Sequence, residues 1–140
     1  MIIVREAIKI AKIKFTQRAL DYLKRRGLAG HLLLLICDDG GGKYSIKDGA
    51  CSMGMMYSII KLDHPDKDYP IVLHNNEGVE IYTSDYDLAE LQDNLHLDYV
   101  NCGLELKNDS QLLDGSVMIG DGPALLKANY HVVMTESRNC

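Results

Sequence analysis

The sequence has no hydrophobic run long enough to cross a membrane. Its longest uninterrupted apolar stretch covers residues 32–37, whereas a membrane helix needs roughly 20 residues. Charged residues interrupt residues 1–15 every few positions, which is unlike a secretory leader. We therefore expect neither a spanning segment nor a leader, and no binding to membranes.

The chain also lacks paired cysteines. Its four cysteines stand far apart, at positions 37, 51, 102 and 140, with no Cys-x-x-Cys pair, so a secreted disulfide framework is not indicated. With 46% hydrophobic and 25% charged residues, the composition excludes a collagen-like repeat and a disordered chain. We interpret residues 1–140 as a single cytoplasmic domain with reduced thiols.

The charge is unevenly distributed along the chain. Residues 1–30 carry eight Lys or Arg against two acids, and residues 31–140 carry seven against eighteen, which gives +6 and −11. An acidic body repels phosphate backbones, and the basic N-terminal part is explained by the solvated faces of one strand and one helix. We therefore expect no nucleic-acid binding.

Hydrophobic periodicity predicts a β-strand, a helix and a second strand in the first 40 residues. Apolar and basic residues alternate over residues 8–15, with one slip at Ala11 that is typical of a bulge. Thr16 can cap a following helix, and Gly27 can end it. The apolar run at residues 31–37 predicts a buried strand, followed by an Asp- and Gly-rich turn.

The remaining segments are mostly short strands. Residues 50–62 are expected to return as a strand, residues 71–73 and 79–82 to form a hairpin, and Ser84 to cap a short helix over residues 86–91. Further strands are predicted over residues 95–99, 104–107 and 116–119, and a helix after Pro123. We therefore predict a mainly β (α+β) fold with two or three short helices, not a parallel α/β fold.

Motifs for common enzyme chemistry are absent. The Gly-rich stretch at residues 39–43 fails the phosphate-loop pattern, because Cys37 and Tyr44 stand where Gly and Ser or Thr are needed. No serine lies in Gly-x-Ser-x-Gly, and no histidine lies in His-Glu-x-x-His. A set of acidic residues could gather a hard cation or simply solvate loops, and it lacks the EF-hand spacing: Asp38, Asp39, Asp48, Asp63, Asp66 and Asp68.

Two cysteines can be brought together by a hairpin. If residues 32–38 and 50–62 pair with the tip near Tyr44, the paired residue numbers sum to 88, and Cys37 stands opposite Cys51. Two thiolates so placed can share a metal. The alternative is that both are buried apolar residues, as free cysteines often are.

The order of segments resembles a known family. A capped helix opens with Thr-x-x-Ala, a buried strand follows, and three stretches come after it: Ala-Cys-Ser-Met-Gly-Met-Met-Tyr at 50–57, Asn-Glu-Gly-Val-Glu-Ile-Tyr at 76–82 and Leu-His-Leu-Asp-Tyr-Val at 95–100. This arrangement, over residues 12–119, resembles the HesB-like, A-type iron–sulfur carriers. The resemblance implies a two-sheet β-sandwich-type domain and makes Cys51 the match for the first cluster ligand of that family.

The chain departs from these carriers in two places. Carriers end in Cys-Gly-Cys, but this chain has no Cys-x-Cys, and residues 108–115 stand where it would be expected. Residues 38–49 resemble an insertion, and residues 120–140 form a C-terminal extension. Cys37 and Cys102 lie outside the family pattern. They could replace the missing ligands, because thiolates suit both iron–sulfur clusters and zinc, or they could be structural.

The resemblance implies a carrier or accessory iron-binding factor in iron–sulfur cluster assembly, and not an enzyme. The expected cofactor is an iron–sulfur cluster or iron. We expect Cys51 to be the first ligand, with Cys37 as its helper and Cys102 as a further metal-binding thiol. Expected partners are iron–sulfur assembly proteins, apo-protein targets and a second copy in a homodimer. The alternative is a module of the same fold that binds no cofactor and acts through protein partners, which the missing Cys-Gly-Cys favours.

Overall fold

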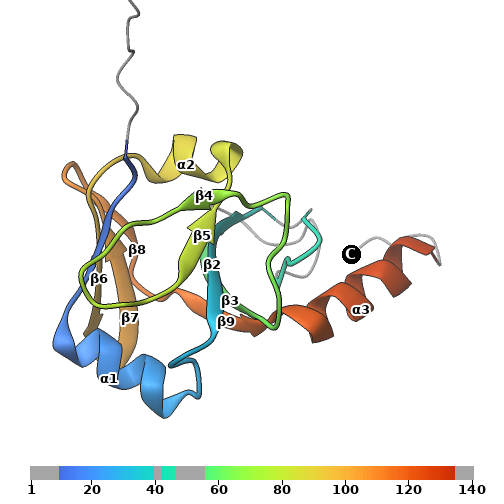
Figure 1. Ribbon diagram of the computed structural model, residues 1–140, viewed down its shortest axis with the longest axis horizontal. Coiled ribbons are helices and arrows are strands. Elements are labelled where there is room, and N and C mark those ends of the chain that lie inside the picture. The colour runs from blue at the N-terminus through green and yellow to red at the C-terminus, as the bar shows by residue number, and fades with distance from the viewer. Residues whose placement is uncertain (1–9, 40–41, 47–55, 135–140) are drawn as a thin grey trace, which may run out of the picture.

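The fold consists of two β-sheets with helices at their edges and ends (Figure 1). The computed structural model describes residues 10–39, 42–46 and 56–134, with side chains up to residue 129. One sheet has the order β1 (Ile13–Phe15), β6 (Leu95–Val100), β7 (Gly103–Lys107), β8 (Leu112–Asp114). The other has the order β4 (Ile71–Val72), β5 (Ile81–Thr83), β2 (Leu32–Asp38), β3 (Met56–Leu62), β9 (Met118–Asp121). This confirms the prediction of a mainly β fold with few helices.

The main core lies between the two sheets. Leu33, Leu35 and Cys37 of β2 point into it, and Leu97 and Leu106 enter it from the other sheet. The alternate β2 residues form a second cluster on the opposite face, where residues from loops and α3 (Gly122–Met134) cover them: Tyr44, Tyr69 and Leu125. Because both faces of β2 are covered, its sequence is continuously apolar and not alternating.

The pairing of β2 with β3 differs from the predicted register. The strands are antiparallel, as predicted, but Leu32 faces Leu62 and Cys37 faces Tyr57. The paired numbers therefore sum to 94 and not 88, and the prediction that Cys37 stands opposite Cys51 is wrong. In the observed register all seven residues of each strand are paired. A shift by an even number keeps every side chain on its face, so hydrophobic alternation could not detect the error.

The predicted helix caps are confirmed. Thr16 precedes α1 (Gln17–Arg25), and its hydroxyl accepts the Ala19 N–H at 3.1 Å. Ser84 precedes α2 (Asp85–Leu91), and its hydroxyl accepts the Asp87 N–H at 3.1 Å. Gly27 follows α1 with φ of 79°, the left-handed conformation that commonly ends a helix.

Other strand predictions hold with changed boundaries. The hairpin of β4 and β5 and the strands β6, β7 and β9 are observed, but β1 covers only three residues, and Ile10 before it is 56% exposed. Strand β8 was not predicted. No helix within the described part of the chain is long and apolar enough to cross a membrane.

Candidate functional site

Cys37 lies at the end of β2, where the strand meets α2. Its side chain is buried, its backbone N–H donates to Asp87 Oδ1 at 2.9 Å, and its thiol donates to the Asp87 carbonyl at 3.9 Å. Burial, together with the nearby Asp87 charge, raises the pKa of the Cys37 thiol to about 12. Since the thiolate is the form that binds metals, a metal can bind Cys37 only by displacing this proton.

Tyr57 faces Cys37 from β3 and connects it to β8. Burial raises the pKa of the Tyr57 hydroxyl, and the neighbouring Cys37 adds to the shift. The Tyr57 backbone N–H donates to Asp114 Oδ2 at 2.9 Å, and the other Asp114 oxygen accepts the Ser116 N–H at 2.8 Å. Asp114 therefore ties the end of β8 to the beginning of β3.

Asp87 is a buried carboxylate that joins α2 to β2. It accepts the Ser84 hydroxyl at 2.6 Å and the Cys37 N–H at 2.9 Å, and the residue is only 4% exposed. Burial raises the pKa of Asp87. A hollow of about 290 Å³ opens beside it, lined by Cys37, Asp38, Tyr44 and Tyr86 among others. The sequence indicates Asp87 only through the N-cap of α2: Ser84 is the cap residue, and Asp87 follows it by three residues at the start of the helix.

Of the six acidic residues considered for a hard cation, the five that the structure describes have partners in the protein. Asp38 accepts the Ser45 hydroxyl at 2.6 Å and the Ile46 N–H at 2.7 Å. Lys43 Nζ lies 2.9 Å from Asp66 Oδ2 and 2.8 Å from Asp68 Oδ2. Among the residues described, no group of three His, Cys, Asp or Glu could hold a metal ion. The ion pairs of Lys43 hold the loop that carries Asp66 and Asp68. Asp48 lies outside the described residues.

Cys102 lies at the other end of the strands. It is exposed in the turn between β6 and β7, where Asn101 and Cys102 have φ of 51° and 66°, typical of a tight hairpin. This end of β6 contacts α1, because Tyr99 stacks on Tyr22 with ring centroids 4.3 Å apart.

The structure therefore does not bring the two described thiols together. Cys37 contacts α2, whereas the β6–β7 turn lies at the α1 end, and Figure 1 shows α1 and α2 at opposite ends of the strands. Cys51, the predicted first ligand, and Cys140 lie outside the described residues.

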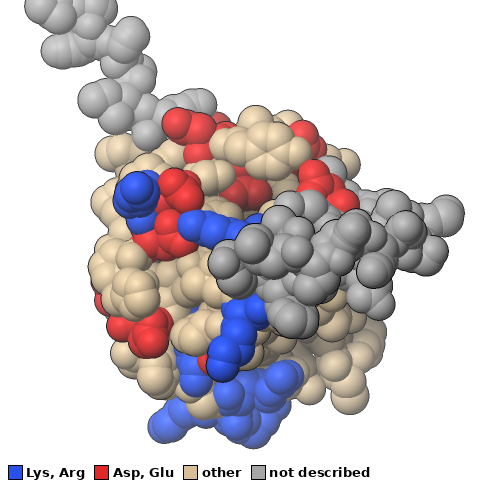
Figure 2. Space-filling model, turned by 90° about the vertical axis from the view of Figure 1, so that its right-hand side faces the viewer, with Lys and Arg blue, Asp and Glu red and all other residues tan. Residues whose placement is uncertain are grey.

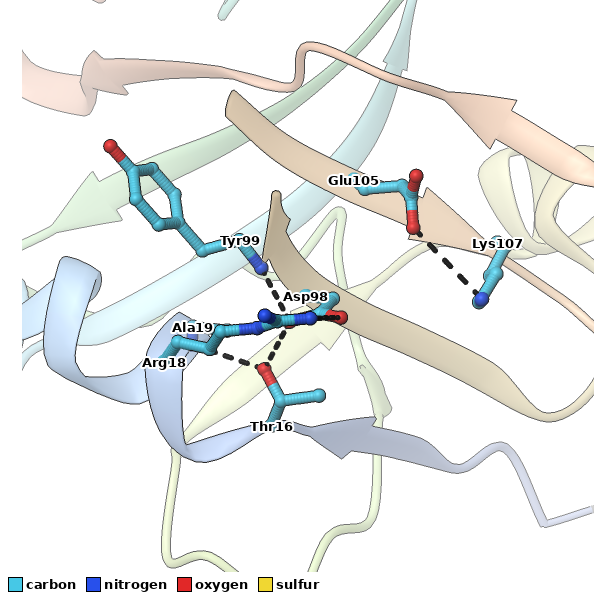
Figure 3. A network of polar contacts seen from close by, with 7 residues as sticks. All are labelled: Thr16, Arg18, Ala19, Asp98, Tyr99, Glu105 and Lys107. Carbon is cyan, nitrogen blue, oxygen red and sulfur yellow. Dashed lines mark hydrogen bonds and ion pairs between the residues drawn. The ribbon is translucent and has the colours of Figure 1, made fainter. Parts of the chain in front are cut away.

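Asp98, within the Leu-Asp-Tyr stretch, has a structural role that sequence reasoning missed. Its Oδ1 accepts the Thr16 hydroxyl at 2.6 Å and Arg18 Nε at 2.9 Å, and its Oδ2 accepts Arg18 Nη2 at 2.9 Å (Figure 3). The Arg18 and Thr16 hydrogen bonds hold the pKa of Asp98 well below its usual range. The network anchors the first turn of α1 on β6.

The charge asymmetry of the sequence appears on the surface. Figure 2 shows basic side chains gathered at the end of the molecule where α1 lies. Lys24 and Arg25 occupy the last turn of α1, where they face the negative end of the helix dipole. Arg25 also lies over the Tyr22 ring, 5.4 Å from its centroid.

Comparison with known proteins identifies the family. The family profile described as "Iron-sulphur cluster biosynthesis" matches residues 11–121. The chain belongs to this family. The HesB-like resemblance of the sequence is thereby confirmed, and the match includes β1 through β9.

Solved structures of candidate Fe-S biosynthesis proteins agree with this family. The crystal structure of one from Lactobacillus acidophilus is 52% identical in sequence, covers 86% of this chain and 98% of its own, and superimposes with a TM-score of 0.77. Another, from Lactobacillus salivarius, is 28% identical, covers 79% of this chain and 97% of its own, with a TM-score of 0.61. A comparison with curated proteins gave no match.

Proposed function

We propose that this protein acts in iron–sulfur cluster assembly by holding a cluster through the Cys51 thiolate and passing it to an apo-protein target. The observation that carries the proposal is the family match over residues 11–121. The 52% identity to a candidate Fe-S biosynthesis protein of solved structure supports it. The cluster is cargo in this account, and the protein's task is to bind and release it.

The start of β3 and residues 108–115 meet at one end of this fold, and each follows or replaces a segment that holds ligands in A-type carriers. Strand β3 begins at Met56, five residues after Cys51, so Cys51 can lie no farther than about 18 Å from it along an extended chain. Residues 108–115 occupy the position of the carriers' Cys-Gly-Cys, and Asp114 of that segment binds the Tyr57 N–H at 2.9 Å. This convergence supports a ligand site near the start of β3.

The second thiolate has to come from elsewhere. Cys37 lies near the start of β3, but it can act as a helper only after it loses its proton, which its burial and Asp87 oppose. Cys102 lies beside the opposite end of the strands. We therefore propose that Cys51 of a second copy supplies the second thiolate, because a cluster can be shared between two subunits. The two further ligand positions of the cluster would fall to Cys37 of each copy, once deprotonated, or to thiols outside the protein.

Release would proceed by thiolate exchange at iron. A deprotonated thiol of the target forms a new Fe–S bond while the bond between iron and Cys51 breaks, and the Cys51 thiolate then takes up a proton from solvent. No electron is transferred, and the iron and sulfide atoms move together. Each step needs an accessible thiolate, which favours Cys51 over the buried Cys37.

Anaerobic reconstitution with iron and sulfide tests the proposal. The wild type should become brown and retain both elements after desalting, whereas Cys51→Ser should remain colourless. Cys102→Ser is the matched control and should retain the cluster, since Cys102 lies at the other end of the strands. Full occupancy in Cys51→Ser, or a wild type that binds neither iron nor sulfide, would contradict the proposal. The second result would favour a partner-binding module without a cluster.

A further inference from the structure

A hollow of about 450 Å³ lies apart from the cysteines, between β1, the start of β6 and the connection from β4 to β5. Side chains rich in hydrogen-bond donors line it: Lys12, Lys14, His74, Asn76, Asn94 and His96. We propose that this hollow binds a small phosphate-bearing ligand. The proposal does not depend on cluster binding.

Strand pairing places the basic side chains of the hollow next to one another. Lys14 is the partner of His96 in the parallel pair of β1 and β6, and Lys12 forms a bridge with His74. Ile13 between the two lysines is buried in the core. Lys12 and Lys14 therefore both project outward on the same side of β1, so that two ammonium groups and two imidazoles surround one space.

The two lysines have no matching acid within the described part of the chain. No ion pair involves Lys12 or Lys14 there, although other lysines of the protein, such as Lys43, are paired with aspartates. Asp109 is the one acidic residue among those described that line the hollow, and Asn94 Nδ2 donates to it at 2.6 Å. Unmatched cations in a protein of net charge −5 point to an anion from outside.

The turn that carries His74 and Asn76 is held in place by Asn75. The Asn75 amide donates to the Leu73 and Val79 carbonyls at 3.1 and 2.8 Å, and its oxygen accepts the Glu77 and Val79 N–H groups. Backbone hydrogen bonds of 2.9 Å join His74 to Ala11 and to Ile13 of β1, and they fix the turn against this part of the chain. Figure 1 shows this connection reaching across from β4 toward β1 and β6. A site held in this way loses little entropy when a ligand binds.

The chemistry of the lining selects the class of ligand. Ammonium, imidazole and amide groups supply donors, and the described lining holds a single carboxylate, Asp109, which accepts a hydrogen bond from Asn94. A lining of this kind favours an anion over a metal cation or a neutral apolar molecule. Lysines bind phosphate oxygens through charge-assisted hydrogen bonds. The volume lies within the range of about 300–1,000 Å³ found for small-molecule sites. The size of the hollow favours a small ligand over an extended acidic peptide, which would need a longer groove.

Calorimetric titration of the full chain with inorganic pyrophosphate at low salt tests the proposal. Wild type should bind, and Lys12→Gln/Lys14→Gln should bind at least about tenfold more weakly, because two charged donors are removed. Lys24→Gln/Lys127→Gln removes the same charge from exposed positions outside the hollow and should change the affinity less than about twofold. Lys12→Arg/Lys14→Arg should restore most of the binding. These variants keep all four cysteines, so the result is independent of the cluster experiment.

Three results would overturn the proposal. The first is a wild type that shows no pyrophosphate binding at millimolar concentrations. The second is an equal loss of affinity in both Gln double variants, which would mean general attraction without a site. The third is binding of hexaglutamate in the absence of pyrophosphate binding, which would assign the surface to an acidic protein segment.

Discussion

Asp98 receives the polar contacts that fix α1 to the sheet. Thr16 and Arg18 reach it from the helix start, and its own strand contributes the Tyr99 N–H at 2.7 Å. The Asp98 side chain is 16% exposed and that of Arg18 is 64% exposed, so solvent weakens the ion pair. The bidentate geometry and the Thr16 hydroxyl nevertheless make Asp98 the residue whose charge matters for the position of the helix.

We expect Asp98→Asn to lower the free energy of unfolding by about 1 kcal/mol near neutral pH, because charge-assisted hydrogen bonds are lost. The pKa of Asp98 is lowered in the folded state. Its contribution is therefore fully present above the unfolded pKa of about 4, declines as the pH falls below that value, and is lost once the pH passes the lowered folded-state pKa. Urea unfolding should show a smaller difference between wild type and variant at pH 3 than at pH 7, because the lowered folded-state pKa keeps part of the contribution at pH 3.

Glu105→Gln is the matched control on the same face. Glu105 lies 3.9 Å from Lys107 in a partly exposed pair (Figure 3), so its replacement should change stability by less than about 0.5 kcal/mol. Two results would contradict this account. In the first, Asp98→Asn is as stable as wild type at pH 7. In the second, the variant loses as much free energy of unfolding at pH 3 as at pH 7, which would mean that the Asp98 charge does not stabilise the fold.

At the scale of elements, α3 packs on β3 through a contact that leaves no room for a side chain. A Cβ added at Gly122 would come 2.4 Å from Leu62 Cδ2 and 2.7 Å from the Lys61 carbonyl. The carbonyl belongs to the backbone of a central strand, so it cannot move aside cheaply. The helix therefore covers the outer face of the sheet only because a glycine stands at its first position.

We expect Gly122→Ala to lower the free energy of unfolding by about 1–3 kcal/mol, the usual range for overpacking a close contact. Chemical unfolding followed by circular dichroism measures this loss. Gly115→Ala serves as the control, since a Cβ there meets no atom within 4 Å, and it should be nearly neutral. Equal stability of the Gly122 variant and wild type would show that α3 is not held this closely.

Element positions could be predicted because caps and alternation are local signals. Thr16 and Ser84 mark helix starts whose hydrogen bonds lie within three residues. The register of β2 with β3 could not be predicted, since pairings that differ by six keep the same faces buried. Strand β8 has three residues, too few for periodicity to be detected, and it depends on pairing with β7.

At the scale of the whole molecule, the sequence predicted the family better than the site. The two-sheet fold and the family followed from the order of segments along the chain. The contact of Cys37 with Asp87 joins residues 50 positions apart, and the contact of Tyr57 with Asp114 joins residues 57 apart. No local pattern encodes such contacts, and the buried state of the Cys37 thiol follows from them.

The central claim is that Cys51 binds an iron–sulfur cluster shared by two chains. Native mass spectrometry of protein purified anaerobically measures the number of subunits and the bound iron and sulfide together. Wild type should appear as a dimer heavier than two bare chains by the mass of one cluster, and Cys51→Ser should lack this added mass. A cluster retained in Cys51→Ser, or a wild type that carries neither iron nor sulfide after reconstitution, would contradict the account.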